Sequence, residues 1–478
     1  MTTEIREGSG GGLHRTLGVA DLVFLYIAAI LGIRWLSTAA QMGPSSLVLW
    51  LLAVVIFFIP SGLAVMELSS RDAGEGGIYL WAKAAFGEQH GFIVGWTYWI
   101  NNLFYFPGLL LFIAGAFLFL GGSEWLGLGE SAYYNAAFSL TLLWLIIGVN
   151  IIGLSRGKWI QNVGAMATAA VFILLAVGGI WAWAEHGSAT EFTLPSLMPN
   201  FGQFSTLTFF ATMTFAFAGL ELGPVMGGEI INPERSLPRA MLVSGLIIAM
   251  IYILGTGLLM VAVPQGEINI ITGIPQALAA IGERIAMPGL AIAGALLVVM
   301  SSIGGLGAWF SGVARIPYVI GIDRYLPAAL GRIHPKWGTP HIALITQGVV
   351  VTLLMIAAVT ESTIEEAYIM LLDMTIILYF IPFMYMFAAL PALRKKAAGN
   401  NAGVSLVPGG NVGVWLCSGL GFSATLLSVV LAMLPPAGSS DPQMFVLKVG
   451  GGCLLFVAAG LIFYYRNRSK VQAPTGVA

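Results

Sequence analysis

The sequence predicts an all-helical integral membrane protein of about twelve transmembrane helices. Of its 478 residues, 58% are hydrophobic and only 9% are charged, and the mean hydropathy is +0.89, unlike the composition of a soluble domain. The charges lie in short stretches between apolar runs of roughly 18 to 25 residues, the length that crosses a bilayer. Two of these runs carry small residues and a charged side chain at their middle. We therefore expect lipid as the solvent and a functional site inside the membrane.

Twelve apolar runs follow one another along the chain, each long enough for one transmembrane helix. They begin near Gly18, Ser45, Gly91, Ser131, Gly157, Phe204, Leu237, Ile285, His341, Ile364, Gly413 and Met444. The organisation that we predict is a cytoplasmic tail at 1–16, a ten-helix transport core at 17–393, a cytoplasmic loop at 394–412, two peripheral helices at 413–465 and a cytoplasmic tail at 466–478.

Two stretches between the seventh and ninth runs depart from simple crossings. The polar loop 262–283 includes a short apolar stretch and Pro275, which predicts a short helix on the outer surface. The run 286–326 is too long for one crossing, so we expect a helix that projects from the membrane and ends near Asp323.

The charged residues between the runs predict the orientation of the protein. If the amino terminus is cytoplasmic, the even-numbered loops receive most Lys and Arg residues. The odd-numbered loops then receive acids, with only Arg284 and Lys448 as cations. Short loops rich in Lys and Arg stay inside. We therefore expect both termini in the cytoplasm of a multi-pass cell-membrane protein, which in a bacterium is the inner or cytoplasmic membrane.

Composition also argues against several classes of function. The formal net charge of −1 gives no basis for binding nucleic acid. Cys417 and Cys453 lie in the last two runs, with neither metal-ligand spacing nor a disulfide framework. The first fourteen residues hold no apolar core with a cleavage site, so no signal peptide is expected. All five histidines lie in or beside loops, and no His-Glu-x-x-His occurs. Neither a metal, a cofactor nor an embedded enzyme is expected.

The first and sixth runs share an unusual middle. The first contains Ala29, Gly32, Ile33 and Arg34, and the sixth contains Phe215, Ala216, Phe217, Gly219 and Glu221, with Gly223 and Pro224 just beyond. Gly lacks the steric barrier that favours the helix and Pro lacks a backbone donor, so both segments can unwind in mid-membrane. Their starts are five helices apart, as two inverted five-helix repeats with paired broken helices predict. The alternative is that these residues only allow close packing or kinks.

Motifs on several separate helices carry a family resemblance. The second run ends in Glu67, Leu68, then Gly76, Gly77, Ile78, Tyr79, Leu80 and Trp81, and the sixth continues into Gly228, Glu229, Ile230, Ile231, Asn232, Pro233 and Arg235. After the eighth run come Ala314, Arg315, Ile316 and Pro317, then Asp323, Arg324 and Pro327. Over residues 17–393 the chain resembles the amino acid, polyamine and organocation permease superfamily.

The resemblance implies a LeuT-like fold of ten core helices in two inverted repeats plus two peripheral helices. It also implies that the backbone at the two breaks holds the amino and carboxylate groups of a substrate. Two departures stand out. The first break lacks the family's Gly-small-Gly sequence, and Thr168 stands where many members carry a lysine. Both bring the chain closer to bacterial glutamate and GABA antiporters and to plant-type polyamine permeases.

Arg34 is the candidate that most separates this chain from the family pattern. A charge in mid-membrane normally faces a cavity or a partner. Arg34 either binds the side-chain carboxylate of an acidic substrate through its paired donors, or it pairs permanently with Glu221. A gating pair that breaks and re-forms as substrate enters lies between these two alternatives.

The other candidates are polar or aromatic residues within apolar runs. At least one of Asn101 and Asn102 is expected to face the interior, and Phe215 and Trp309 are expected to flank the cavity, with packing as the alternative for both rings. Glu221 either contacts substrate or ties down the amides freed at its break. Glu67 is a gating or structural candidate, and Asp373 is a candidate proton site or a partner for Arg34.

These observations predict a secondary active amino acid transporter, a permease or exchanger that works by alternating access. Acidic amino acids or their derivatives are the expected substrates, with polyamines or other organocations as the alternative. A permease-like sensor is the third alternative, although no signalling domain is evident. The expected partners are a small-molecule substrate and the lipid bilayer. A coupling proton or counter-substrate and the oligomeric state are left open.

Overall fold

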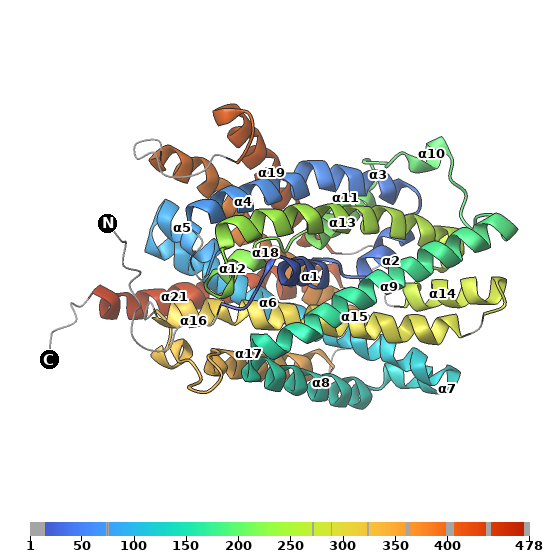
Figure 1. Ribbon diagram of the computed structural model, residues 1–478, viewed down its shortest axis with the longest axis horizontal. Coiled ribbons are helices and arrows are strands. Elements are labelled where there is room, and N and C mark those ends of the chain that lie inside the picture. The colour runs from blue at the N-terminus through green and yellow to red at the C-terminus, as the bar shows by residue number, and fades with distance from the viewer. Residues whose placement is uncertain are drawn as a thin grey trace.

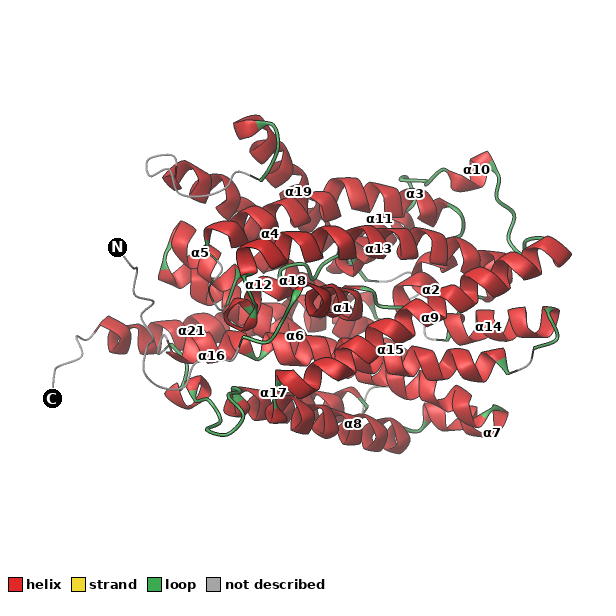
Figure 2. Ribbon diagram, viewed as in Figure 1, coloured by secondary structure: helices red, strands yellow, loops and turns green. Residues whose placement is uncertain are grey.

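The computed structural model describes residues 15–72, 74, 76–269, 272–287, 289–322, 325–359, 364–397, 406–435 and 441–472. In this part of the chain the fold is all helical (Figures 1 and 2). Leu17 and Ile230 form an isolated parallel bridge. The helices are α1 Val19–Ile30, α2 Arg34–Gln41, α3 Ser45–Ala53, α4 Ile59–Arg71, α5 Ile78–Phe86, α6 Glu88–Leu118, α7 Ser123–Leu126, α8 Ala132–Ile152, α9 Leu154–His186, α10 Leu194–Leu197, α11 Phe204–Ala216, α12 Leu222–Val225, α13 Pro233–Ala262, α14 Gly273–Arg284, α15 Leu290–Val313, α16 Arg315–Ile322, α17 His341–Ala358, α18 Ile364–Ala397, α19 Gly410–Ala432, α20 Pro442–Val446 and α21 Gly452–Gln472.

The described helices include ten that are long and apolar enough to cross a membrane. Two of these spans each consist of two helices joined by a π-helical turn. The turns are Val54–Phe58, between α3 and α4, and Leu447–Gly451, between α20 and α21. An eleventh span is formed by α1 and α2, which meet at a bend of 43°. The all-helical membrane fold is therefore confirmed.

The remaining one of the twelve predicted spans, the sixth along the chain, corresponds to α11 and α12. The apolar part of α11, Thr206–Ala216, is shorter than a full crossing, and α12 continues it after an interruption. The count of twelve, the inverted repeat and the domain limits given above stay predictions. The tail 1–14, residues 398–405 of the predicted loop and residues 473–478 lie outside the described residues, as do Asp323 and Arg324.

Both unusual stretches contain helices, as expected from the sequence, while the place of the first on the outer surface and the projection of the second from the membrane stay predictions. Within the stretch 262–283, α14 packs against α2, α9 and α15. The long run after it begins with α15, turns at Ala314 and continues as α16. Ser37 lies against Gly273 at the start of α14, so closely that a Cβ on that glycine would come within 2.7 Å of the serine hydroxyl oxygen.

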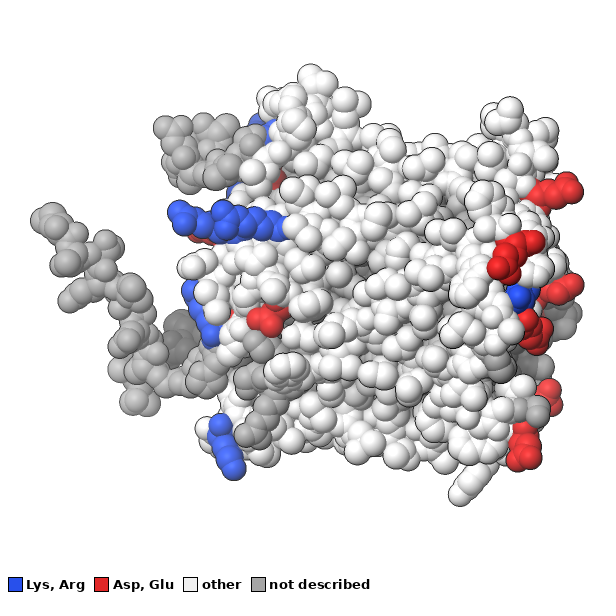
Figure 3. Space-filling model, turned by 45° about the vertical axis from the view of Figure 1, so that its right-hand side comes forward, with Lys and Arg blue, Asp and Glu red and all other residues white. Residues whose placement is uncertain are grey.

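The exposed charges separate to opposite ends of the bundle. Figure 3 shows most of the visible Lys and Arg side chains at the end where α5, α16 and α21 lie, and most of the visible Asp and Glu side chains at the end that carries α7, α10 and α14. Between them the surface is almost free of charge, as lipid contact requires. Exposed Leu, Ile, Val, Phe and Trp side chains of α8, α9, α19 and α21 cover this middle band.

The broken helices lie at the centre of the bundle (Figure 1). Helix α1 packs against α9, α13 and α15, while α11 packs against α3 and α19. Helices α6 and α18 have the largest buried share among the spans, and they pack against each other on the other side of the breaks. The breaks are thus shielded from lipid by unbroken helices, where irregular backbone is tolerated in a membrane.

Candidate functional site

The first broken helix is interrupted at three residues, Leu31, Gly32 and Ile33, between α1 and α2. Gly32 fits because a Cβ at this position would lie 2.7 Å from the indole nitrogen of Trp35. The Ile33 N–H, at the start of α2, has no hydrogen-bond acceptor among the described residues. A free amide at a helix amino end is a ready position for an anion.

The second broken helix is interrupted at 217–221, between α11 and α12. Gly219 has φ of 135°, a backbone conformation that favours glycine strongly. A Cβ there would lie 2.7 Å from Ile30 Cγ1 and 3.2 Å from Trp309 Cζ2. Gly219 therefore allows both the turn and the close approach of the two breaks.

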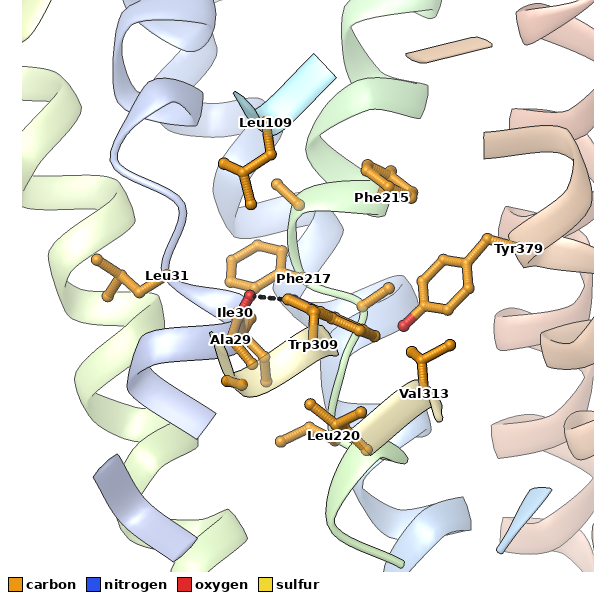
Figure 4. Packing of buried hydrophobic residues seen from close by; sticks show 14 of the residues in the cluster. Ala29, Ile30, Leu31, Leu109, Phe215, Phe217, Leu220, Trp309, Val313 and Tyr379 are labelled. Atoms are coloured by element: carbon orange, nitrogen blue, oxygen red, sulfur yellow. Dashed lines mark hydrogen bonds between the residues drawn. The ribbon is translucent and has the colours of Figure 1, made fainter. Parts of the chain in front are cut away.

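Two side chains from other helices bind the backbone that the breaks expose. Trp309 of α15 donates its indole N–H to the Ala29 carbonyl over 2.8 Å, the dashed contact in Figure 4. The Tyr252 hydroxyl of α13 lies 2.5 Å from the Ile30 carbonyl oxygen and 3.1 Å from that of Ala216, and it accepts from the Gly32 N–H over 3.2 Å. The two breaks are thus held next to each other.

A small cavity of about 20 Å³ lies beside the breaks, with room for about one water molecule. It is lined by Ala29, Ile30, Trp35, Asn101, Asn102, Tyr105, Phe215, Ala216, Ala218, Trp309 and Tyr379. All of these residues are buried except Tyr105, which is half-buried. The space, here called the central cavity, is therefore walled by buried side chains.

Asn101 and Asn102 both line the central cavity, on α6. Their amide N–H groups donate to the helix itself, to Thr97 O and Tyr98 O from Asn101 and to Tyr98 O from Asn102. With the donors used in this way, the carbonyl oxygens are the groups left for a ligand in the cavity. Such oxygens suit an ammonium group.

Aromatic rings form a second part of the cavity wall. Phe215 of α11 meets Trp35 of α2 edge to face at 5.7 Å and Tyr379 of α18 at 5.6 Å. Figure 4 shows Phe215 and Tyr379 near Trp309, whose ring centroid is 5.9 Å from that of Tyr379. The Trp35 and Phe215 pair closes the cavity on the side of α2 and α11.

Glu221 lies at the start of α12, on the side of the breaks where α1 and α12 pack together. Its carboxylate is completely buried and accepts hydrogen bonds from the hydroxyls of Tyr98 (3.0 Å) and Tyr379 and from the Gly219 N–H (3.1 Å). It therefore ties α6, α18 and the second break together. This matches the alternative in which Glu221 binds a freed amide.

Arg34 does not line the central cavity. It lines a neighbouring space, also of about 20 Å³, with Gly32, Ile33, Leu109, Phe112, Ser301 and Ser302, among others. Its guanidinium carbon lies 4.4 Å from the ring centre of Trp35 and 4.9 Å from that of Tyr105. Tyr105 and Ala29 line both spaces. The Tyr105 ring therefore lies between the Arg34 guanidinium and the central cavity.

The ion pairs of the described residues do not join Arg34 to Glu221 or to Asp373. Asp373 is half-buried in α18 and lines neither space. Thr168, where the family commonly has a lysine, lies with its hydroxyl 2.5 Å from that of Ser301.

Two other candidates also lie away from both spaces. Phe217 packs against Trp50, Phe58 and Tyr252 on the far side of the second break. Glu67 is fully buried at the end of α4 and binds Arg71, Arg394 and the Val407 N–H. In this structure Glu67 connects α4 to the segment before α19.

Sequence reasoning missed the tyrosines. Four tyrosines line the central cavity or form hydrogen bonds to Glu221 and to the backbone at the breaks, namely Tyr98, Tyr105, Tyr252 and Tyr379. A signal was present, because a phenolic hydroxyl in mid-membrane requires a hydrogen-bond partner. In the described part of the chain, no group of three or more His, Cys, Asp or Glu side chains is placed to hold a metal.

Comparison with known proteins gives the family. Residues 17–459 match the amino acid permease family. An uncharacterized transporter of Legionella pneumophila is 29% identical, covering 96% of this chain and 98% of its own length. A probable agmatine/putrescine antiporter of Lactococcus lactis is 26% identical over 96% of this chain and 95% of its own. A serine/threonine exchanger of Bacillus subtilis is 26% identical over 83% and 87%.

Proposed function

The chain belongs to the amino acid permease family, and on that basis we propose that it is a secondary active amino acid permease or exchanger that prefers acidic amino acids. It is a multi-pass transporter of the cell membrane, not an enzyme, and its substrates are small molecules. The substrate class, the site and the mechanism are the proposal.

The observation that carries the proposal is the central cavity with buried walls beside two helix breaks. An amino acid carries one ammonium and one carboxylate. The Asn101 and Asn102 carbonyl oxygens in the central cavity suit the ammonium. The free Ile33 N–H at the start of α2, which lines the neighbouring space, suits the carboxylate once the two spaces are joined. An amino acid needs more room than this cavity of about 20 Å³, so the proposal includes a movement of one helix bundle against the rest that widens it.

Each end of the cavity has its own barrier in this proposal. On the side of α2 and α11, the Trp35 and Phe215 rings form the outer barrier. On the side of α1 and α12, the Glu221 carboxylate with Tyr98 and Tyr379 forms the inner one. Alternating access then requires the two barriers to open in turn, so that substrate exchanges sides without a continuous pore.

Arg34 supports the preference for acidic substrates. A cation one ring away from the cavity attracts a side-chain carboxylate and repels a second ammonium. The two spaces are neighbours through Tyr105 and Ala29. A rotation of the Tyr105 ring would join them, and the guanidinium then offers paired donors to a carboxylate.

A polyamine or related organocation is the second candidate. The Asn101 and Asn102 carbonyl oxygens would also accept from a primary amine, and a relative is named as a probable agmatine/putrescine antiporter. The Arg34 charge opposes this candidate. The relatives reported above differ in the charge of their named substrates, so their names alone do not decide between an acidic and a cationic substrate.

Counterflow into proteoliposomes tests the substrate class. Vesicles loaded with an unlabelled compound are given the same compound in labelled form, with L-glutamate, L-aspartate, L-serine, L-arginine and putrescine compared. We expect accumulation of L-glutamate and L-aspartate above the other three. Accumulation of putrescine or L-arginine alone would contradict the acidic preference.

Arg34 variants test the role of the charge. We expect Arg34→Ala to reduce L-glutamate exchange by at least about tenfold, the loss of one charge-assisted contact. The L-glutamate exchange of Arg34→Lys should lie between that of the wild type and that of Arg34→Ala, because an ammonium keeps the charge but loses the paired donors. Arg332→Ala, which removes an exposed arginine, is the control. Unchanged affinity and rate in Arg34→Ala would remove Arg34 from the site.

The separation of surface charges supports the orientation with both termini in the cytoplasm. The end rich in Lys and Arg is then cytoplasmic. A membrane-impermeant thiol reagent added to intact cells should react with a cysteine at exposed Glu185 and spare one at exposed Lys336. The reverse pattern would invert the assignment.

A further inference from the structure

The Tyr252 hydroxyl serves three backbone groups that belong to both breaks. It lies within hydrogen-bond distance of Ile30 O, Ala216 O and the Gly32 N–H. The side chain is completely buried. No other side chain in the described part of the chain bonds the backbone of both interrupted helices.

A hydroxyl has one hydrogen to donate and two acceptor positions. Tyr252 therefore can donate fully to only one carbonyl at a time, and the shorter contact, 2.5 Å to Ile30 O, is the better one. Ala216 O, at 3.1 Å, is the acceptor that is only partly satisfied. Inside a membrane an unsatisfied carbonyl is costly, so this oxygen is a favourable partner for another donor.

The position of the hydroxyl is fixed by helices that are not broken. The Tyr252 ring stacks on Trp50 of α3, with ring centroids 4.5 Å apart and planes 4° apart. Trp50 is held in turn, because its indole N–H donates to the Thr256 hydroxyl of α13 over 3.0 Å. Tyr252 is thus a fixed reference against which both breaks are positioned.

The carbonyls that Tyr252 reaches belong to residues of the cavity wall. Ile30 and Ala216 both line the central cavity, whereas Tyr252 does not. Tyr252 therefore meets the backbone from behind while the same segments face the ligand. A change at its hydroxyl alters where the backbone lies without removing any atom from the cavity.

We propose that Tyr252 is a positioning residue that sets the spacing of the two breaks and thereby the affinity for the ammonium and carboxylate groups of an amino acid. The inference rests on the proposed function, in which those two groups bind between the breaks. It assigns Tyr252 no contact with substrate. The hydroxyl acts through Ile30, Gly32 and Ala216.

Tyr252→Phe tests the inference, because it keeps the ring and removes only the hydroxyl. Exchange of labelled L-glutamate in proteoliposomes gives KM and kcat separately. We expect KM to rise about tenfold, the order expected for one buried hydrogen bond, with kcat within about threefold of the wild type. A purely structural role would lower the active fraction, and so kcat, at unchanged KM.

Tyr134→Phe is the matched control. The Tyr134 hydroxyl also donates to a backbone carbonyl, that of Ala114 over 2.8 Å, but it lines neither space. Its KM should stay within about twofold of the wild type. An unchanged KM in Tyr252→Phe, or an equal rise in Tyr134→Phe, would overturn the inference.

Thr256→Val keeps the test usable if Tyr252→Phe does not fold. It removes the acceptor that holds Trp50, which loosens the stacked ring but leaves the hydroxyl. A smaller rise in KM is expected, and no rise would count against the inference. Failure of the proposed function shows in the wild type, which would then not exchange L-glutamate. In that case the KM of each variant is compared with the KM of the wild type for whichever labelled compound the wild type transports.

Discussion

Arg34 illustrates how a single charge is accommodated within the membrane. A charged residue at the centre of a transmembrane helix costs about 2.5 to 3.5 kcal/mol on insertion scales. Two aromatic rings lie within 5 Å of the guanidinium carbon, and a desolvated cation–π contact is worth about 2 kcal/mol. The contacts with Trp35 and Tyr105 are therefore large enough to offset most of that cost. The charge can be kept next to the cavity without Glu221 as its counter-ion.

Gly219 gives a second prediction at the scale of one residue. Its φ is 135°, and a Cβ added at this position would lie 2.7 Å from Ile30 Cγ1, which leaves no room for a side chain. We expect Gly219→Ala to lower stability by about 1 to 3 kcal/mol, the usual cost of such backbone strain, and to reduce exchange at least tenfold. Thermal unfolding in detergent and proteoliposome exchange measure the two effects.

Gly148→Ala provides the control for this prediction. Gly148 lies within α8, and a Cβ there meets no atom within 4 Å. Alanine is the better helix former, so this variant should be as stable as the wild type or slightly more so. If Gly219→Ala behaved in the same way, the close approach of the two breaks would not matter for function.

The limits of sequence reasoning are clearest at the residue scale. Glu221 stands out in the sequence because a charge is unusual at the middle of a membrane helix, and Gly219 stands out because it lies close to that charge. The same reasoning applies to Tyr252, yet its role depends on three helices meeting at one point. That meeting comes from the packing of α13 against α1 and α2, and no periodicity within one helix reveals it.

Among the elements, the segment before α1 and the segment after α12 act as one unit. Glu229 accepts backbone hydrogen bonds from Thr16 (2.9 Å) and Leu17 (3.1 Å), and Ile231 donates to Leu17 (2.9 Å). The Glu229 carboxylate pairs with Arg315, at the start of α16, over 2.6 Å. Both charged side chains are buried. We call this set of contacts the inner clip.

The inner clip should favour closure on the side of α1 and α12. Replacing Glu229 and Arg315 together by Met removes the ion pair without leaving one buried charge alone, which would destabilise the fold. A cysteine at Ala218, in the cavity wall, then reports access from that side in inside-out vesicles. We expect its reaction with a thiol reagent to be about tenfold faster in the double variant, as a shift of about 1.4 kcal/mol in the closed population would give.

The matched comparison carries the same Ala218 cysteine with Arg332→Met, which removes an exposed arginine outside the inner clip. Its reaction rate should equal that of the Ala218 cysteine alone. Equal rates in the double Met variant would mean that the ion pair does not hold this side closed. Cys417 and Cys453 are buried, and their background reaction is measured in the unaltered protein.

At the scale of the whole molecule, the sequence predicts the helices well and their arrangement only in part. The runs expected at Ser45, His341 and Ile364 begin at those residues, and the run expected at Gly18 begins one residue later. Hydropathy is sufficient for this, because each helix must match the bilayer on its own. The sixth run is different, since its interruption leaves α11 too short to register as a crossing.

The arrangement of the site required the three-dimensional structure. One alternative from the sequence makes Arg34 and Glu221 neighbours across the two breaks, but they lie with different partners, Arg34 with two aromatic rings and Glu221 with two tyrosines. A one-residue shift along a helix turns a side chain by about 100°, and no charge pattern in the sequence determines that angle. The division into a central cavity and a neighbouring space follows from it.

The structure of the protein with L-glutamate bound tests the central claim most directly. We predict the α-ammonium group near the Asn101 and Asn102 carbonyl oxygens and the α-carboxylate near the Ile33 N–H. The side-chain carboxylate should lie within hydrogen-bond distance of Arg34, with the Tyr105 ring rotated aside. Ligand density outside the central cavity and the neighbouring space, or a side chain directed away from Arg34, would contradict the proposed site and its preference for acidic substrates.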